Sequence, residues 1–261
     1  MDSLTTYLEQ NRDRFVDDLV QWLRIPSVSA QAQHKEDCVR AAQHLADRLK
    51  SVGMTRAEVI PTKGHPVVYA EWLGAPGAKT VVVYGHYDVQ PPDPLELWKT
   101  PPFEPVVRDG KVFARGAVDD KGQVYMHVNA IEAHLKVNGK LPVNLKMVIE
   151  GEEEVGSESI EAFLVEWKDR LKGDLLVVSD TAMLGPDQPA LTYGLRGILY
   201  TQIEVVGPKQ DLHSGHFGGA VGWATITSPA YPRKLWPSNW AIGSTPKRPR
   251  RVGAKSRQST S

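Results

Sequence analysis

Apolar residues recur at steps of three and four near the start of the chain, which is the pattern of amphipathic helices. Between Leu4 and Leu23 they predict one such helix, and Pro26 ends the pattern. A second helical pattern runs from about Glu36 to Val52 and stops at Gly53. Glycine readily adopts the left-handed conformation that ends many helices. The pattern therefore predicts two helices before the first strand.

Strand-like and helical segments then alternate as far as Val178. Runs of β-branched and aromatic residues predict strands at 57–60, 67–73, 80–84, 111–114, 143–149 and 174–178, and periodic segments predict helices at 122–137 and 159–171. Strands separated by long helices are typical of a mostly parallel sheet with helices on both faces. Because 81–83 and 175–178 are apolar throughout, we expect these strands to be buried on both sides. The predicted fold class is α/β.

Composition narrows the possible chemistry. The 261 residues are 41% hydrophobic and 24% charged, as in a globular protein. The sequence shows neither a membrane-spanning apolar run nor an export signal after Met1, so we expect a cytoplasmic protein without a membrane partner. The single cysteine, Cys38, excludes a zinc site built from several thiolates, and we expect it to pack in the core. Any metal would be held by His, Asp and Glu side chains.

Charge is unevenly distributed although the formal net charge is zero. Eight of the 31 basic residues and none of the acidic ones lie in 222–261, a stretch rich in Ser, Pro and Trp without helix or strand periodicity. The favoured interpretation is a disordered basic extension. A contact with nucleic acid or another acidic surface is the alternative, and nucleic acid is not the expected partner.

Metal-capable residues follow three apolar strands. His86, the acidic run that begins at Glu150, and Asp180 stand at strand ends, and Asp119 precedes a predicted helix. Taken singly, such residues are more often turn, cap or solvated loop residues. Because the carboxyl ends of parallel strands lie at one edge of a sheet, we expect them to meet there. One imidazole and several carboxylates suit zinc, cobalt or manganese.

Five motifs strengthen this interpretation. They are Tyr84–Pro91 (YGHYDVQP), Gly116–Gly122 (GAVDDKG), Glu150–Ser157 (EGEEEVGS), Ser179–Asp180 and Asp211–Gly215 (DLHSG). In these motifs the chain resembles the cocatalytic zinc metallopeptidase family that includes carnosinase-like cytosolic dipeptidases, acetylornithine deacetylase and succinyl-diaminopimelate desuccinylase. The resemblance covers roughly residues 1–221 and is strongest to the dipeptidase branch.

The resemblance implies two divalent metal ions, zinc first, with cobalt or manganese as alternatives. It implies that His86 and Asp180 bind one ion, that Asp119 bridges both, and that Glu154 binds the second. It also implies that Glu153 is the general base. The substrate would be a dipeptide or an N-acyl amino acid, whose amide bond is hydrolysed.

Further roles follow from the same resemblance. Asp88, two residues after His86, would hold the imidazole in its metal-binding tautomer, with a turn residue as the alternative. His213 would stabilise the oxyanion, often across a homodimer formed through a lid domain. The peptide bond between Asp119 and Asp120 would be cis.

The resemblance ends near residue 221. The family pattern continues to a final metal-binding histidine, but this sequence has no histidine after His216. We therefore predict a product that is truncated or frameshifted after about residue 221. Its domains would be an incomplete metal-binding catalytic α/β domain at 1–193, the beginning of a lid or dimerisation domain at 194–221, and the basic tail at 222–261. Weak occupancy of the second metal site and greatly reduced hydrolysis are expected, and the alternative is a non-catalytic metal-binding protein.

Overall fold

The structure is a computed structural model that describes residues 3–185, 188–195 and 197. Contacts divide the chain into two units, Met1–Thr192 and Tyr193–Ser261, and the architecture below belongs to the first. The predicted lid segment 194–221 is described only at residues 194, 195 and 197, so His213 lies outside the described residues. The basic tail 222–261 lies outside them as well.

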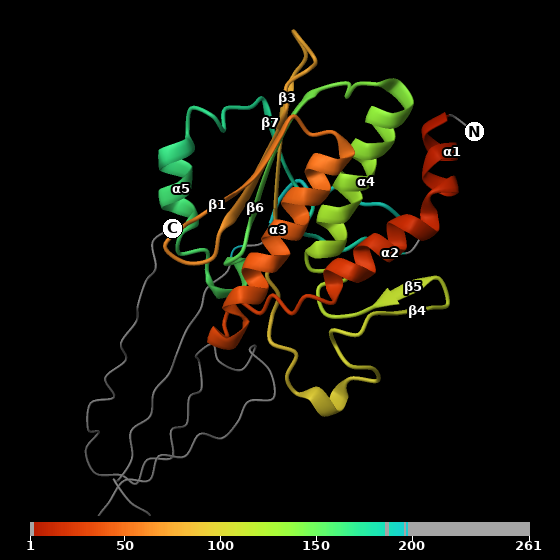
Figure 1. Cartoon of the computed structure of the whole chain (residues 1–261), viewed down its shortest axis with the longest axis vertical. Helices are drawn as coiled ribbons and strands as arrows, with labels where there is room; N and C mark the ends of the chain where they lie inside the picture. Colours follow the sequence, from red (N-terminus) through yellow and green to blue (C-terminus); the bar gives the residue numbers. More distant parts are fainter. Residues whose placement is uncertain (1–2, 186–187, 196, 198–261) are drawn as a thin grey trace, which may run out of the picture. The chain divides into compact units, whose positions relative to one another are not determined.

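A five-stranded sheet forms the centre of the first unit (Figure 1). In spatial order its strands are β1 (Arg56–Ile60), β2 (Val67–Trp72), β6 (Asn144–Glu150), β3 (Thr80–His86) and β7 (Leu175–Val178). The strands β6, β3 and β7 are parallel, whereas the β1–β2 hairpin is antiparallel and joins β6 antiparallel. A separate hairpin contains β4 (Val106–Arg108) and β5 (Lys111–Phe113). The predicted α/β fold class is confirmed.

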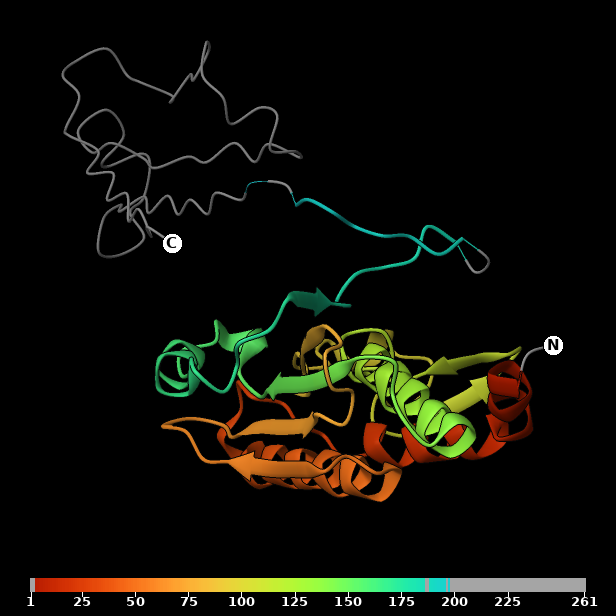
Figure 2. The same ribbon diagram turned by 90° about the horizontal axis from the view of Figure 1, so that it is seen from above.

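Helices cover both faces of this sheet (Figures 1 and 2). On one face, α3 (Lys35–Val52) and α4 (Lys121–Asn138) enclose the larger core cluster, which includes the buried Cys38. On the other face, α5 (Ile160–Trp167) packs Phe163 against a smaller cluster on β2 and β6. Short 3₁₀ turns η1 (Ala32–His34), η2 (Leu95–Leu97) and η3 (Glu153–Val155) connect these elements. No helix within the described residues has the length and apolar character needed to cross a membrane.

The single helix predicted from Leu4 to Leu23 is instead two helices, α1 (Ser3–Gln10) and α2 (Arg12–Leu23). The break is at Asn11, whose side-chain amide donates a hydrogen bond to the carbonyl of Tyr7 at 2.9 Å. Asparagine competes for backbone groups in this way and is therefore unfavourable inside helices. The apolar period continues across the break, which is why the pattern did not reveal it.

The expectation that β7 is buried on both sides is wrong for the described structure. Leu175, Leu176 and Val178 have exposed fractions of 58%, 62% and 48%. Within the described residues β7 is an edge strand that pairs with β3 alone. A run of four apolar residues is compatible with a central strand or an edge strand, because the run does not specify what packs against it.

A charged cluster fixes α4 to the three N-terminal helices. Glu132 of α4 accepts hydrogen bonds from Tyr7 of α1 (2.8 Å), Arg14 of α2 and Arg48 of α3. Glu132 is nearly inaccessible to solvent. Burial acts to raise its pKa, but the hydrogen bonds from Arg14 and Tyr7 outweigh burial and lower the pKa below the usual 4.5. This cluster therefore holds in place the helix that begins at the predicted metal-binding residues.

Replacing Glu132 with glutamine should lower the free energy of unfolding at pH 7 by roughly 1.5–3 kcal/mol, because charge-assisted hydrogen bonds to a buried carboxylate are lost while Asp18 still pairs with both arginines. A carboxylate whose pKa is lowered by folding stabilises the protein above its unfolded pKa and loses that effect as the pH falls. The difference between wild type and variant should therefore shrink as the pH falls below about 4.5. Urea unfolding of both proteins between pH 7 and pH 3 measures this difference. The control is Glu161→Gln, since Glu161 is exposed. A difference that stayed constant over this range would contradict the role of Glu132.

Candidate metal centre

Three parallel strands bring distant residues to one edge of the sheet. His86, the last residue of β3, is the register partner of Glu150, the last residue of β6. Val178 at the end of β7 pairs with Tyr84, so Asp180, two residues later, lies level with His86. The convergence that the sequence predicts for strand ends is thus produced by parallel pairing.

The N-terminus of α4 reaches the same edge because Gly85 has no side chain. A Cβ atom at Gly85 would lie 2.5 Å from Asp120 Oδ2 and 2.8 Å from Val124 Cγ2, both closer than packed atoms allow. With glycine there, Asp120 Oδ2 accepts a hydrogen bond from the backbone N–H of His86 at 3.1 Å. Asp119 therefore stands beside His86, and the Asp119–Asp120 peptide is cis, as the resemblance implies.

His86, Asp119 and Asp180 offer ligand atoms that all lie within 4.8 Å of one another. His86 Nε2 is 3.1 Å from Asp119 Oδ1 and 3.7 Å from Asp180 Oδ2. Ligand atoms held tetrahedrally at about 2.1 Å from one ion are about 3.4 Å apart, so these separations suit a shared cation. His86 is buried, whereas the Asp119 and Asp180 side chains retain access to solvent.

Asp88 contacts the other nitrogen of the His86 ring. His86 Nδ1 lies 3.1 Å from the backbone carbonyl oxygen of Asp88 and 3.4 Å from its carboxylate Oδ1. The carboxylate accepts hydrogen bonds from the backbone N–H groups of Glu153 (3.2 Å) and Glu154 (3.1 Å) and from the Ser29 hydroxyl (2.6 Å). Both the main-chain carbonyl and the carboxylate of Asp88 thus face the imidazole, and the carboxylate also holds the turn that carries the two glutamates.

The two glutamates of η3 are placed differently. Glu153 Oε2 lies 4.0 Å from His86 Nε2, at the margin of the three-residue group. Glu154 Oε2 accepts a hydrogen bond from Gln90 Nε2 at 2.6 Å and is not part of that group. The structure therefore brings together three of the four predicted ligands and leaves Glu154 with a protein partner.

The electrostatics of the group favour a bound cation. Burial acts to lower the pKa of His86, but the hydrogen bond with Asp88 and the nearby negative charges raise it to about 10. Burial raises the pKa of three acidic neighbours, and repulsion from adjacent carboxylates adds to this rise: Glu153, Glu154 and Asp180. The raised pKa of the imidazole and the raised pKa values of the carboxyl groups share a contributing cause, which is an excess of negative charge at this site. Protons or a metal ion must compensate that charge. A metal must displace the imidazole proton to bind there.

The donor set fits a divalent metal ion. One neutral imidazole nitrogen with carboxylate oxygens is the combination that zinc and neighbouring first-row metals accept. Once it has lost its proton, the nitrogen of His86 that faces Asp119 and Asp180 can bind a metal, because the opposite nitrogen can donate to the Asp88 carbonyl. The described residues can therefore hold one metal ion through His86, Asp119 and Asp180.

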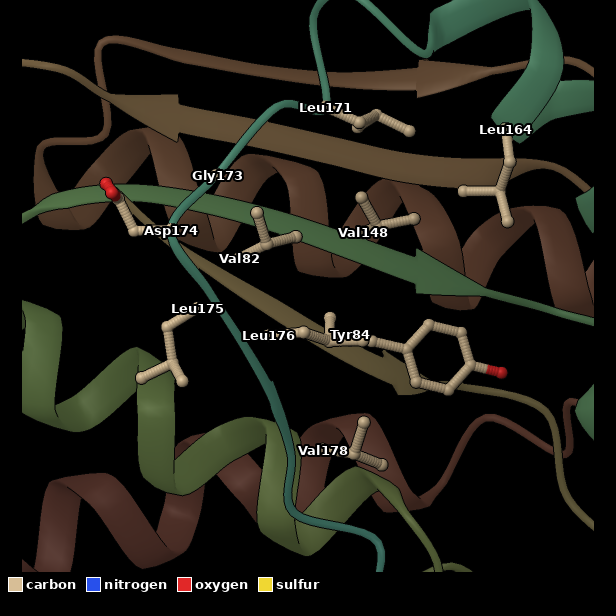
Figure 3. Close-up of a pocket in the computed structure, with 10 residues that line it drawn as sticks. All are labelled: Val82, Tyr84, Val148, Leu164, Leu171, Gly173, Asp174, Leu175, Leu176 and Val178. Atoms are coloured by element: carbon tan, nitrogen blue, oxygen red, sulfur yellow. The ribbon is translucent and has the colours of Figure 1, made fainter. Parts of the chain in front are cut away.

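An apolar hollow lies elsewhere, on the face of the sheet that α5 covers (Figure 3). Its volume is about 520 Å³, and its lining is apolar, with Val82, Leu164 and Leu176 among the contributing residues. The acidic side chain there, Asp174, accepts hydrogen bonds from Lys79 Nζ (2.9 Å) and the backbone N–H of Thr80 (2.8 Å), at the opposite end of β3 from His86. This hollow lacks the groups needed for the predicted chemistry.

Two residues of the site were missed by the sequence interpretation. Asp120 was named only within a motif and the expected cis peptide bond, with no role for its side chain, yet it is buried and its pKa is raised to about 7, first of all by burial. Gln90 lies in another quoted motif and hydrogen-bonds Glu154. Their positions in those motifs were the available signal, but neither side chain is distinctive enough to reveal its partner.

The comparisons with known proteins agree with this geometry. Residues 82–233 match peptidase family M20/M25/M40. The chain belongs to this family. The resemblance to this metallopeptidase family that the motifs indicated is therefore confirmed, and the family implies use of divalent metal.

Several relatives of this M20-family chain are dipeptidases. It is 38% identical over 235 residues to the Cys-Gly metallodipeptidase dug1 of Schizosaccharomyces pombe, covering 85% of this chain and 49% of that protein. It is 37% identical over 233 residues to the human Beta-Ala-His dipeptidase, covering 84% and 46%. The solved structure of the dipeptidase Dug1p from Saccharomyces cerevisiae matches with a TM-score of 0.72 at 33% identity, covering 84% and 49%. The chain spans about half the length of these relatives.

Proposed function

We propose that this chain carries the metal centre of a metal-dependent dipeptidase, which hydrolyses the amide bond of a dipeptide or an N-acyl amino acid. The observation that carries the proposal is the convergence of His86, Asp119 and Asp180 at one sheet edge. Membership of the M20 family and the dipeptidase names of its relatives support it.

The proposed centre holds two divalent ions, with zinc the first choice. His86 and Asp180 would bind one, Asp119 would bridge both, and Glu154 would bind the second after releasing Gln90. Such ions, when bound, polarise the scissile carbonyl group and lower the pKa of water. The second ion would have to displace Gln90 from the Glu154 carboxylate, so we expect it to bind more weakly than the first.

Glu153 would act as the general base. Its side chain is 38% exposed and lies 4.0 Å from His86 Nε2, so it can reach both solvent and the metal centre. A carboxylate in this place can accept the proton of the attacking water and donate it to the leaving amine. Asp88 would keep His86 and the η3 turn in position. Oxyanion stabilisation by His213 and a homodimer through the lid remain predictions, since both concern residues outside the described ones.

A non-catalytic metal-binding protein is the second candidate. It is favoured by Glu154, whose carboxylate accepts a hydrogen bond from Gln90 and does not join His86, Asp119 and Asp180. This candidate and the dipeptidase share the first metal site and differ in turnover.

Metal content and hydrolysis of the purified chain distinguish the two candidates. After equilibration with zinc and dialysis, we expect about one tightly bound ion per chain, with a second bound only at higher zinc concentration. Cys-Gly and β-Ala-His are suitable substrates, and hydrolysis should be slow, increase with added zinc and stop with a chelator. Bound metal without turnover would favour the second candidate. A chain that binds no metal would contradict both.

A further inference from the structure

A histidine outside the proposed ligand set contacts the segment that carries Asp180. His127 Nε2 lies 2.7 Å from the hydroxyl oxygen of Ser179, which directly precedes Asp180. His127 is in the second turn of α4 and is partly buried. The two side chains are 52 residues apart in sequence, so this contact exists only in the folded chain.

The segment that carries Asp180 has few other attachments. The parallel ladder of β7 with β3 ends at the pair of Tyr84 and Val178, so Ser179 and Asp180 lie beyond it. The backbone hydrogen bond next to them, from Thr181 N–H to the Ser179 carbonyl at 2.8 Å, is local and does not fix them to the sheet. The contact with His127 therefore ties this short edge segment to the body of the protein.

The same helix also positions a second proposed ligand. Asp119 directly precedes Asp120, the N-cap residue of α4, and Asp120 accepts a hydrogen bond from the backbone N–H of His86. The helix is itself anchored, because Lys121 Nζ donates hydrogen bonds to the carbonyls of Trp22 (3.2 Å) and Ile25 (2.8 Å). One rigid element thus sets the place of Asp119 at its start and of Asp180 through His127.

We propose that His127 is a positioning residue that orients the Asp180 ligand through the hydroxyl of Ser179. This inference rests on the proposed metal site. Partners of metal ligands commonly change metal affinity by about 10- to 100-fold when they are removed, because a misplaced ligand atom cannot reach the ion. Burial lowers the pKa of His127, so the ring is neutral at pH 7 and does not repel a cation.

Zinc affinity of the full chain, measured by competition with a chromophoric chelator, tests the proposal. His127→Ala and Ser179→Ala should each weaken zinc binding by about 10- to 100-fold. The double variant should lose no more than either single variant, because both remove the same contact. His127→Gln retains a side-chain amide that can bond the hydroxyl, and its affinity should return to within about threefold of wild type. The control is His134→Ala, since His134 is on the same helix and hydrogen-bonds Asn138 instead.

Two further measurements separate positioning from general stability. The melting temperature of the metal-free variants should match that of metal-free wild type, and the visible spectrum of the cobalt-loaded protein should change in His127→Ala but not in His134→Ala. If His127→Ala fails to fold, the zinc affinities of Ser179→Ala and His127→Gln test the proposal instead. Wild-type affinity in both His127→Ala and Ser179→Ala would overturn the proposal while leaving the metal site intact. A wild-type chain that binds no zinc would overturn the proposed function and this inference together.

Discussion

Replacing His86 with alanine should weaken zinc binding by about 100- to 1000-fold, the largest loss of metal affinity expected of a single substitution among the described residues. Structural zinc sites contribute about 10–16 kcal/mol over four ligands, so each ligand supplies roughly 3 kcal/mol. His86 is the only nitrogen donor among the three described residues that converge, and its buried ring lies within 3.7 Å of both aspartates. Removing it leaves carboxylates alone, which bind zinc less well.

Competition with a chromophoric chelator measures this loss of zinc affinity. The matched control is His134→Ala, since His134 lies near the C-terminal end of α4, away from the proposed ligands. Circular dichroism should show that the variant keeps its secondary structure, because the Glu132 cluster and the core do not involve His86. Zinc affinity equal to that of wild type would show that the metal binds elsewhere and would exclude His86 as a ligand.

Replacing Glu153 with glutamine should lower dipeptide hydrolysis by about 100- to 10,000-fold, the range typical of a lost general base. Glutamine has nearly the same shape as glutamate but cannot accept the proton of the attacking water. Zinc content should remain at the wild-type level, since Glu153 lies at the margin of the three-residue group and is not a proposed ligand.

The rate is measured above the background of the His86→Ala variant, with Glu158→Gln as a control on the same loop. Glu158 is exposed, so its substitution should leave both rate and zinc content unchanged. A Glu153→Gln protein that hydrolysed dipeptides at the wild-type rate would exclude Glu153 as the base. Loss of zinc from this variant would instead make Glu153 a ligand.

These two predictions test the different roles that the family resemblance implies for neighbouring motif residues. His86, Glu153 and Glu154 all stand in motifs at strand ends, but the structure gives them different surroundings. His86 is buried between two aspartates, Glu153 faces solvent near the centre, and Glu154 is bonded to Gln90. Replacing His86 should therefore remove the metal, and replacing Glu153 should remove turnover. The effect of replacing Glu154 depends on whether a metal ion displaces the Gln90 amide from its carboxylate.

Element types were predictable because apolar periodicity is local. The helices α3 and α4 and the strands β3 and β6 lie within a few residues of their predicted ranges, since each is specified by neighbours three or four residues away along the helix, or two along the strand. The break at Asn11 and the exposed face of β7 were not predictable in this way. The first depends on one side-chain hydrogen bond inside a continuous pattern, and the second on what packs against the sheet.

The amino-acid sequence alone determined that this is an α/β protein whose acidic and imidazole groups follow strands, because composition and periodicity act over short distances along the chain. Only the tertiary structure decided which of these groups meet. Parallel register placed Asp180 level with His86, a missing side chain at Gly85 admitted the start of α4, and folding brought His127 to Ser179 across 52 residues. Such contacts depend on strand order and on distances of a few ångströms between segments, which no local pattern contains.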